Sequence, residues 1–493
     1  MAKVIMVQGT MSNAGKSLLV AGLARVFWQD GYRVAPFKSQ NMALNSFITR
    51  DGLEMGRAQV VQAEACGREP SVRMNPILLK PTTDVGSQVI VNGEVIGNYR
   101  AGDYYKMKHT LWPDVEEAFN TLCDENDIVV VEGAGSPAEI NLKQDDFVNM
   151  GLAKRFHIPV LLVGDIDRGG VFAQLAGTQM LLDPEENELL KATVINKFLG
   201  DVEILRPGLK QLEEIMHKPV AGVLPYLHVD IEDEDSLTSR FGKRTRAMID
   251  VAVVQLPRIS NFTDFTALEA TDGVSVRYVS HVRELGSPDA VVLPGTKNTI
   301  SDLRWLRESG LEAAVLHLAD AGTPVVGICG GYQMLGRRVT DTCGAEGGGA
   351  IDGLGLLPTE TEFEPEKHRT RVEGTVLPNP LIPEGTSVTG YEIHMGRTVL
   401  DASAVPLLRL DNGDLDGCVS GNVFGCYIHG FFDTVASRRA FLELIGRRKG
   451  ISPEDLTVVD YGEYKRQQFD ILADAVRQNL DMELIRRILD NKL

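Results

Sequence analysis

Short apolar runs alternate with longer amphipathic stretches through the first half of the chain. The runs predict strands at Val4–Val7, Arg33–Phe37, Ile128–Val131, Pro159–Val163, Thr193–Ile195 and Val220–Leu224. Between the first two runs, residues 17–29 carry apolar side chains at helical spacing over a broad face. Regular alternation of strands and helices predicts a doubly wound α/β domain, with a mostly parallel sheet covered by helices on both faces.

A second α/β series follows a dense acidic stretch at residues 230–236. Its predicted strands are Ile249–Gln255, Ser275–Val279, Ala290–Leu293, Pro324–Ile328, Ser387–Ile393 and Val423–Ile428. Because like charges repel one another and prefer water, the acidic stretch is typical of a solvated linker. We therefore predict a first domain at 1–229, a linker at 230–248, a second domain at 249–445 and a helical, charged C-terminal tail at 446–493.

Composition narrows the possible functions. The 493 residues are too many for one core, and 43% hydrophobic with 24% charged residues is ordinary for a globular protein. A net charge of -18 argues against nucleic-acid or anionic-membrane partners, although a locally basic pocket could still bind an anionic small molecule. The six cysteines form no C-x-x-C pair, and no apolar run approaches the roughly 20 residues that cross a bilayer. We expect a cytoplasmic protein without a disulfide framework.

A glycine-rich turn follows the first predicted strand and leads into the first predicted helix. In such a turn, backbone N–H groups and the helix N-terminus converge on phosphate oxygens, a lysine reaches the terminal phosphates and a hydroxyl binds Mg²⁺. Here five residues separate the two glycines instead of the usual four. The predicted nucleotide-binding residues of this loop are Gly9, Thr10, Asn13, Ala14, Gly15, Lys16 and Ser17.

The tips of other predicted strands carry further candidates. Glu132 ends a buried strand where parallel sheets bind ligands, so we expect it to bind magnesium together with Ser17. The long phosphate loop resembles that of dethiobiotin synthetase and its relatives, ATP-dependent enzymes that activate a carboxylate by phosphorylation. The resemblance implies that Lys38 lies near the transferred phosphoryl group, with Asn41 beside it, and that Asn196 contacts the adenine.

The second half contains a candidate nucleophile. Cys329 lies in Gly327-Ile328-Cys329-Gly330-Gly331, where a predicted strand turns sharply into a helix. The glycines permit a tight backbone turn, and a helix N-terminus favours the thiolate over the thiol. This arrangement is typical of a reactive cysteine rather than an inert core cysteine.

A cysteine nucleophile needs a base within hydrogen-bond reach. His429 ends a predicted strand, and we prefer it to His394 as that base. Backbone N–H groups near Gly295 and Gly330 could form an oxyanion hole. The arrangement resembles the class I glutamine amidotransferase domain, which implies that Cys329 attacks the amide of glutamine and releases ammonia.

One position departs from that family. It usually has a glutamate two residues after the histidine, and here position 431 is phenylalanine. Either the cysteine and histidine act as a dyad, or another carboxylate such as Glu392 or Asp433 orients the ring.

Together the two halves predict ATP-dependent activation of a carboxylate and its capture by ammonia from glutamine. Several long segments, 8–17, 37–46, 74–81, 164–173 and 327–336, resemble those of the cobyric acid synthase family of cobalamin biosynthesis. The resemblance covers nearly the whole chain. It implies that the substrates are ATP, glutamine and a corrinoid polycarboxylate, adenosylcobyrinic acid a,c-diamide, whose b, d, e and g side-chain carboxylates become amides.

Three alternative functions are compatible with parts of this sequence. Cobyrinic acid a,c-diamide synthase has the same architecture and amidates different carboxylates. A partner-binding P-loop ATPase switch shares the first fold but leaves Cys329 and His429 unexplained. A regulatory protein with an inactive glutaminase is disfavoured because both residues are present.

Overall fold

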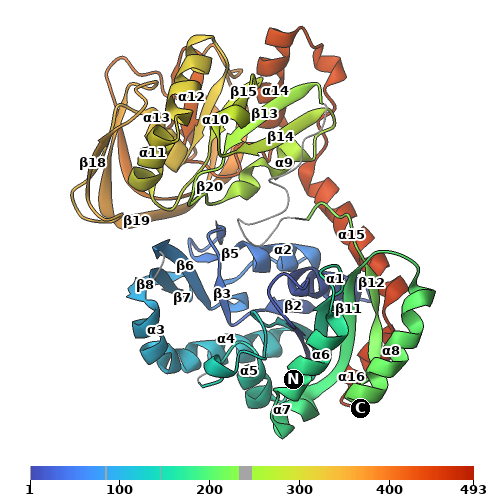
Figure 1. Ribbon diagram of the computed structural model, residues 1–493. Coiled ribbons are helices and arrows are strands. Elements are labelled where there is room, and N and C mark those ends of the chain that lie inside the picture. Colours follow the sequence, from blue (N-terminus) through green and yellow to red (C-terminus); the bar gives the residue numbers. More distant parts are fainter. Residues whose placement is uncertain (1, 84–85, 145, 232–246, 493) are drawn as a thin grey trace. The chain divides into compact units, whose positions relative to one another are not determined.

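The computed structural model describes residues 2–83, 86–144, 146–231 and 247–492. The chain forms two compact units. The first comprises residues 1–43, 54–234 and 465–493, and the second comprises residues 44–53 and 235–464. Figure 1 shows the helices and strands of both units.

A six-stranded sheet forms the centre of the first unit, in the order β12-β11-β10-β1-β9-β2. All of its neighbouring strands run parallel. Strands that are buried on both faces need apolar residues at nearly every position, which explains the continuous apolar runs in the sequence. The strands are β1 (Lys3–Gly9), β2 (Val34–Phe37), β9 (Ile128–Glu132), β10 (Val160–Asp165), β11 (Leu190–Phe198) and β12 (Val220–Pro225).

Helices and a smaller sheet complete the first unit. The smaller sheet has the order β3-β6-β7-β8, with β3 (Gln40–Met42), β6 (Ile77–Thr83), β7 (Gly86–Val91) and β8 (Glu94–Arg100), and β5 (Glu54–Gly56) lies before α2 in the sequence. The helices are α1 (Lys16–Gln29), α2 (Arg57–Ala65), α3 (Ala101–Met107), α4 (Trp112–Glu125), α5 (Met150–Phe156), α6 (Val171–Met180), α7 (Pro184–Leu189), α8 (Val202–Met216), α16 (Met482–Leu489) and α15 (Tyr461–Asn479), which belongs to this unit from Lys465 onward.

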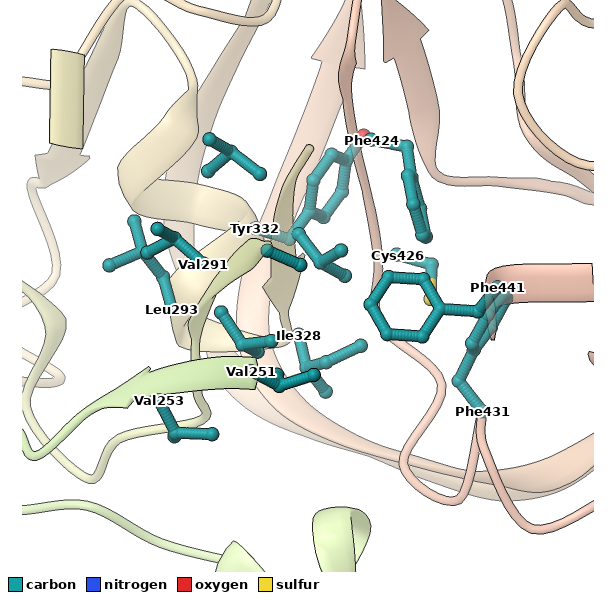
Figure 2. Packing of buried hydrophobic residues seen from close by; sticks show 14 of the residues in the cluster. Val251, Val253, Val291, Leu293, Ile328, Tyr332, Phe424, Cys426, Phe431 and Phe441 are labelled. Carbon is teal, nitrogen blue, oxygen red and sulfur yellow. The ribbon is translucent and has the colours of Figure 1, made fainter. Parts of the chain in front are cut away.

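The second unit has its own six-stranded sheet, in the order β14-β13-β15-β16-β24-β23, with only β23 antiparallel to its neighbour. Its strands are β13 (Ile249–Val254), β14 (Val274–Val279), β15 (Ala290–Leu293), β16 (Val325–Ile328), β23 (Cys418–Ser420) and β24 (Val423–Cys426). The helices are α9 (Thr266–Glu269), α10 (Val282–Leu285), α11 (Thr299–Glu308), α12 (Leu311–Asp320), α13 (Gly330–Leu335) and α14 (Val435–Lys449). Figure 2 shows how side chains of β13, β15 and β24 pack with Phe431 and Phe441 in one apolar core.

A second sheet of this unit carries a long antiparallel pair, β19 (Thr359–Val376) and β20 (Ser387–Leu400). The other strands of the unit are β4 (Ser46–Ile48), β17 (Arg338–Asp341), β18 (Gly349–Asp352), β21 (Leu408–Leu410) and β22 (Leu415–Asp416). No helix among the described residues is long and apolar enough to cross a membrane.

The α/β architecture of both halves is confirmed, and each strand predicted in the first half overlaps one of the six strands of the parallel sheet. The C-terminal tail is helical as predicted, with α15 and α16, and most of it packs in the first unit. Residues 465–493 belong to the first unit, where Ala473, Val476 and Ile485 lie in the apolar core with α1. Apolar side chains at helical spacing on α15 and α16 provide that buried face. Of the predicted linker, residues 232–246 lie outside the described residues.

Candidate active site

The loop between β1 and α1 has a backbone conformation that requires glycine at position 15. Gly15 adopts φ 95°, and a Cβ there would lie 1.9 Å from Nδ2 of Asn196. That Nδ2 donates a hydrogen bond to the carbonyl of Ala14 at 2.9 Å, so Asn196 holds the loop in shape. Asn13 also has a positive φ of 59°. The loop therefore presents the start of α1 beside the carboxyl ends of the parallel strands, where phosphate groups bind in sheets of this kind.

Lys16 lies across this loop. Its Nζ donates to the carbonyl of Met11 at 3.0 Å and to that of Gly135 at 3.1 Å, and the residue is buried. A Cβ at Gly9 would lie within 3.1 Å of the Lys16 amine, so the glycine makes room for the side chain. Thr10 donates from Oγ1 to Gln174 at 3.2 Å. Side chains and carbonyls of neighbouring segments thus hold the predicted phosphate-loop residues in place.

Glu132, at the end of β9, is the centre of a buried polar cluster. Its Oε1 accepts hydrogen bonds from Oγ of Ser17 and from Nζ of Lys38, each at 2.8 Å. Its Oε2 accepts a hydrogen bond from Nε2 of Gln62. Because Glu132 is fully buried, its charge needs these donors, and the Lys38 ammonium supplies the opposite charge.

No sequence pattern indicated Gln62 as a site residue. The residue lies on α2 and is 1% exposed, and its Oε1 has no hydrogen-bond partner among the described residues. Asn41 is buried as well and donates from Nδ2 to Gln59, also on α2, at 3.1 Å. A single buried glutamine on a helix belongs to no recognisable sequence motif. The spacing of Gln59 and Gln62, three residues apart on one helix, nevertheless indicates a polar helix face.

In the second unit, four neighbouring parallel strands deliver one residue each to the same edge of the sheet. Asp264 comes after β13, Gly295 after β15, Cys329 after β16 and His429 after β24. The carboxyl ends of parallel strands meet at one edge, so the topology explains why residues so distant in the sequence come together.

Cys329 is held in a strained turn. Its φ of 51° and ψ of -108° are unusual for a residue with a side chain, and the backbone is fixed by a hydrogen bond from its N–H to the carbonyl of Cys426 at 2.9 Å. A Cβ at Gly331 would lie 1.9 Å from the carbonyl oxygen of Leu293, so only glycine fits there. The turn places the sulfur next to the carbonyl of Ile393, at 3.6 Å. Strain of this kind is common at nucleophiles.

His429 lies between Cys329 and a carboxylate. Its Nδ1 is 2.7 Å from Oδ2 of Asp264, and Oδ1 of Asp264 accepts the backbone N–H of Gly430 at 3.0 Å. Burial lowers the pKa of His429, but the charges of Asp264 and Cys329 and a hydrogen bond to each outweigh burial and raise the pKa to about 10. The imidazolium form is therefore favoured at neutral pH, paired with Asp264 on one side and Cys329 on the other.

The carboxylate beside Nδ1 of His429 belongs to Asp264, and not to Glu392 or Asp433. It lies 165 positions before His429, on a short 3-10 helix (Phe262–Phe265). In the sequence, Asp264 lies in Phe262-Thr263-Asp264-Phe265. An acidic residue in such an aromatic segment indicates a buried carboxylate, which needs a hydrogen-bond partner.

The two predicted oxyanion loops also meet. A Cβ at Gly330 would lie 3.0 Å from the backbone nitrogen of Thr296, and one at Gly295 would lie 3.0 Å from Cε1 of His429. Both turns are thus packed closely around the cysteine and histidine, where backbone N–H groups can receive a developing negative charge.

Three other side chains near Cys329 have the composition of a metal site. Among the described residues, His368, Glu392 and His394 form the one such group, with ligand atoms within 4.8 Å of one another. Nε2 of His368 lies 3.0 Å from Glu392, whose hydrogen bond raises the pKa of His368. Nδ1 of His394 donates to the carbonyl of Gly396 at 2.7 Å, and burial lowers its pKa to about 4. His394 has no carboxylate on Nδ1, unlike His429.

Comparisons with known proteins agree with this division. Residues 5–236 match the CobQ/CobB/MinD/ParA nucleotide binding domain, and residues 250–436 match the CobB/CobQ-like glutamine amidotransferase domain. A solved glutamine amidotransferase structure covers 40% of this chain and 98% of its own chain at 21% identity, with a TM-score of 0.31.

Full-length relatives are much more similar. Cobyric acid synthase of Ruminiclostridium cellulolyticum is 57% identical and that of Lachnoclostridium phytofermentans 54% identical, each over 99% of this chain, with 98% and 99% of the relatives covered. Cobyric acid synthase of Yersinia enterocolitica is 52% identical over 98% of both chains. The chain belongs to the cobyric acid synthase family of glutamine-dependent, ATP-using ligases.

Proposed function

We propose that this protein converts adenosylcobyrinic acid a,c-diamide to adenosylcobyric acid by amidating its b, d, e and g carboxylates with ATP and glutamine. The observation that carries the proposal is the presence of two sites in one chain, the Glu132 cluster with its phosphate loop and the Asp264–His429–Cys329 array. The substrate rests on the full-length similarity to cobyric acid synthases.

The second unit would release ammonia from glutamine. The Cys329 thiolate attacks the side-chain amide carbon, and the backbone at Gly295 and Gly330 binds the oxyanion. The His429 imidazolium gives its proton to the departing nitrogen as the carbon–nitrogen bond breaks, which leaves a thioester and free ammonia. His429 then takes a proton from water, the hydroxide attacks the thioester, and glutamate leaves as the sulfur–carbon bond breaks.

The first unit would activate the carboxylate. A substrate carboxylate oxygen attacks the terminal phosphorus of ATP, and the bond to ADP breaks to give an acyl phosphate. Lys16 and Lys38 place positive charge beside the transferred group. Ammonia then attacks the acyl carbon, loses a proton and displaces phosphate.

The residues at this site fit a magnesium ion. The hydroxyl of Ser17 and the carboxylate of Glu132 are the oxygen donors that Mg²⁺ prefers, and Oε1 of Gln62 is a buried oxygen in the same cluster with no hydrogen-bond partner among the described residues. When bound, Mg²⁺ would neutralise phosphate charge. Asn196 is expected to lie beside the adenine, with one of its amide hydrogens already donated to the loop.

Separate nitrogen sources test the division of labour. Cys329→Ala should abolish amidation with glutamine and leave ATP-dependent amidation with ammonium, because only the nucleophile is lost. Lys16→Ala should stop amidation with either source while glutamine hydrolysis remains measurable. Loss of ammonium-supported amidation in a folded Cys329→Ala protein would contradict the proposal.

A further inference from the structure

A short stretch of the first half of the chain belongs to the second unit. Residues 44–53 group with residues 235–464, whereas the chain before and after them belongs to the first unit. Asn45, Ser46, Phe47, Ile48 and Thr49 are all at most 8% exposed. Five consecutive buried residues indicate that this stretch is packed in place rather than lying on the surface as an ordinary connection.

Ser46 is bound to two side chains of the second unit. Its carbonyl oxygen accepts a hydrogen bond from Oη of Tyr391 at 3.0 Å and one from Nδ2 of Asn261 at 3.3 Å. The same Nδ2 donates to Oη of Tyr391 at 2.7 Å. One backbone carbonyl of residues 44–53 thus fixes two side chains that are 130 residues apart in the sequence.

Phe47 adds an aromatic contact on the same side. Its ring meets that of Tyr391 edge-to-face, with centroids 5.4 Å apart and planes at 64°. The guanidinium of Arg371 lies 5.1 Å from the centroid of Phe47. Tyr391 is therefore held both through its hydroxyl and through its ring.

Tyr391 in turn supports His429. The two rings stack with centroids 5.3 Å apart and planes at 23°. Their backbones exchange two hydrogen bonds, at 3.1 Å from Tyr391 and at 2.9 Å from His429. Asn261 immediately precedes the short helix that carries Asp264, the carboxylate on Nδ1 of His429. Ser46 consequently contacts the supports of His429 from both directions.

We propose that residues 44–53 are part of the glutaminase site, where Ser46 and Phe47 position His429 through Tyr391 and Asn261. The inference rests on the proposed glutaminase role of His429. The proposal assigns a positioning function to a stretch that begins six residues after Lys38. A segment from the first half of the sequence therefore contributes directly to ammonia release in the second unit.

Three full-length variants test the proposal by glutamate release from glutamine. Phe47→Ala removes the ring contact, and Tyr391→Phe removes the hydroxyl while keeping the ring that stacks on His429. Asp51→Asn, on an exposed residue of the same stretch, is the matched control. Rates are expressed per folded protein, with the folded fraction of each variant measured by circular dichroism, so that a smaller folded fraction cannot lower them.

Phe47→Ala should lower kcat ten- to hundredfold with KM for glutamine within about twofold, because a misplaced general acid slows chemistry more than binding. Tyr391→Phe should lower kcat less, by about three- to tenfold, and Asp51→Asn should match the wild type. Should Phe47→Ala fail to fold, Tyr391→Phe decides.

Wild-type kcat in the folded variants, or an equal loss in Asp51→Asn, would overturn the positioning role. The readout needs no corrinoid. If the wild type hydrolyses glutamine and the variants behave as expected but no corrinoid is amidated, the proposed substrate fails and the positioning role stands.

Discussion

Replacing Asp264 with asparagine tests the least expected member of the glutaminase site. The substitution keeps the size of the side chain and removes the charge that lies 2.7 Å from Nδ1 of His429, with both groups buried. The pKa of His429 is about 10 against an ordinary 6.5, which at about 1.4 kcal/mol per unit corresponds to roughly 5 kcal/mol in favour of the imidazolium. Asp264 and Cys329 share that effect.

Removing one partner of a buried, hydrogen-bonded charge pair costs about 2–5 kcal/mol, so kcat for glutamine hydrolysis should fall by about 30-fold or more. Glutamate release measured by a coupled assay gives kcat directly, and amidation with ammonium should be unchanged because the first unit is intact. Asp433→Asn is the control, since Asp433 is the nearest carboxylate after His429 in the sequence and does not hold Nδ1. Wild-type kcat in Asp264→Asn, or an equal loss in Asp433→Asn, would refute the reasoning.

Three further predictions follow from the geometry. Gln62→Leu leaves Glu132 without one buried donor, so amidation with either nitrogen source should fall about tenfold while glutaminase kcat stays constant, and an unchanged amidation rate would contradict the role of Gln62. Since the pKa of His429 is raised in the folded state, protonated His429 stabilises the fold fully below pH 6.5, and this stabilisation is lost as the pH rises through about 10. The difference in unfolding temperature between wild type and His429→Gln should therefore shrink from pH 6.5 to about 10. A constant difference would contradict the raised pKa of His429. Gly331→Ala should lower the free energy of unfolding in denaturant by more than about 3 kcal/mol, because its Cβ would collide with the Leu293 carbonyl. Gly177→Ala on α6 is the control and should be neutral or stabilising, because a Cβ there meets nothing within 4 Å. Equal effects of the two substitutions would contradict the close contact at Gly331.

Patterns of neighbouring residues in the sequence predicted most of the strands and the glycine turns. The apolar runs located all six strands of the first large sheet and every strand of the second except β23, whereas the run at Ser387–Ile393 lies in β20 of the antiparallel sheet. The glycine turns located the loop between β1 and α1 and the turn that carries Cys329. Each of these features needs particular residues at adjacent positions, because a tight backbone turn constrains its own neighbours.

Contacts between distant segments left no comparable trace. Asp264 meets His429 across 165 positions only because β13 and β24 belong to one sheet, and the order of strands in a sheet is not written in any one of them. The assignment of Ser46 to the second unit, and of α15 and α16 to the first, likewise depends on tertiary packing. Gln62 was missed because a buried amide becomes recognisable only when its partner, Glu132, is placed.

The central claim is that ammonia from glutamine reaches four corrinoid carboxylates through an ATP-dependent step. The most direct measurement incubates the protein with ATP, Mg²⁺, adenosylcobyrinic acid a,c-diamide and glutamine labelled with ¹⁵N in its amide, and follows the corrinoid by mass spectrometry. We predict four successive conversions of carboxylate to amide, each carrying the label and each dependent on ATP. An unchanged corrinoid mass in a sample that hydrolyses glutamine would contradict the claim.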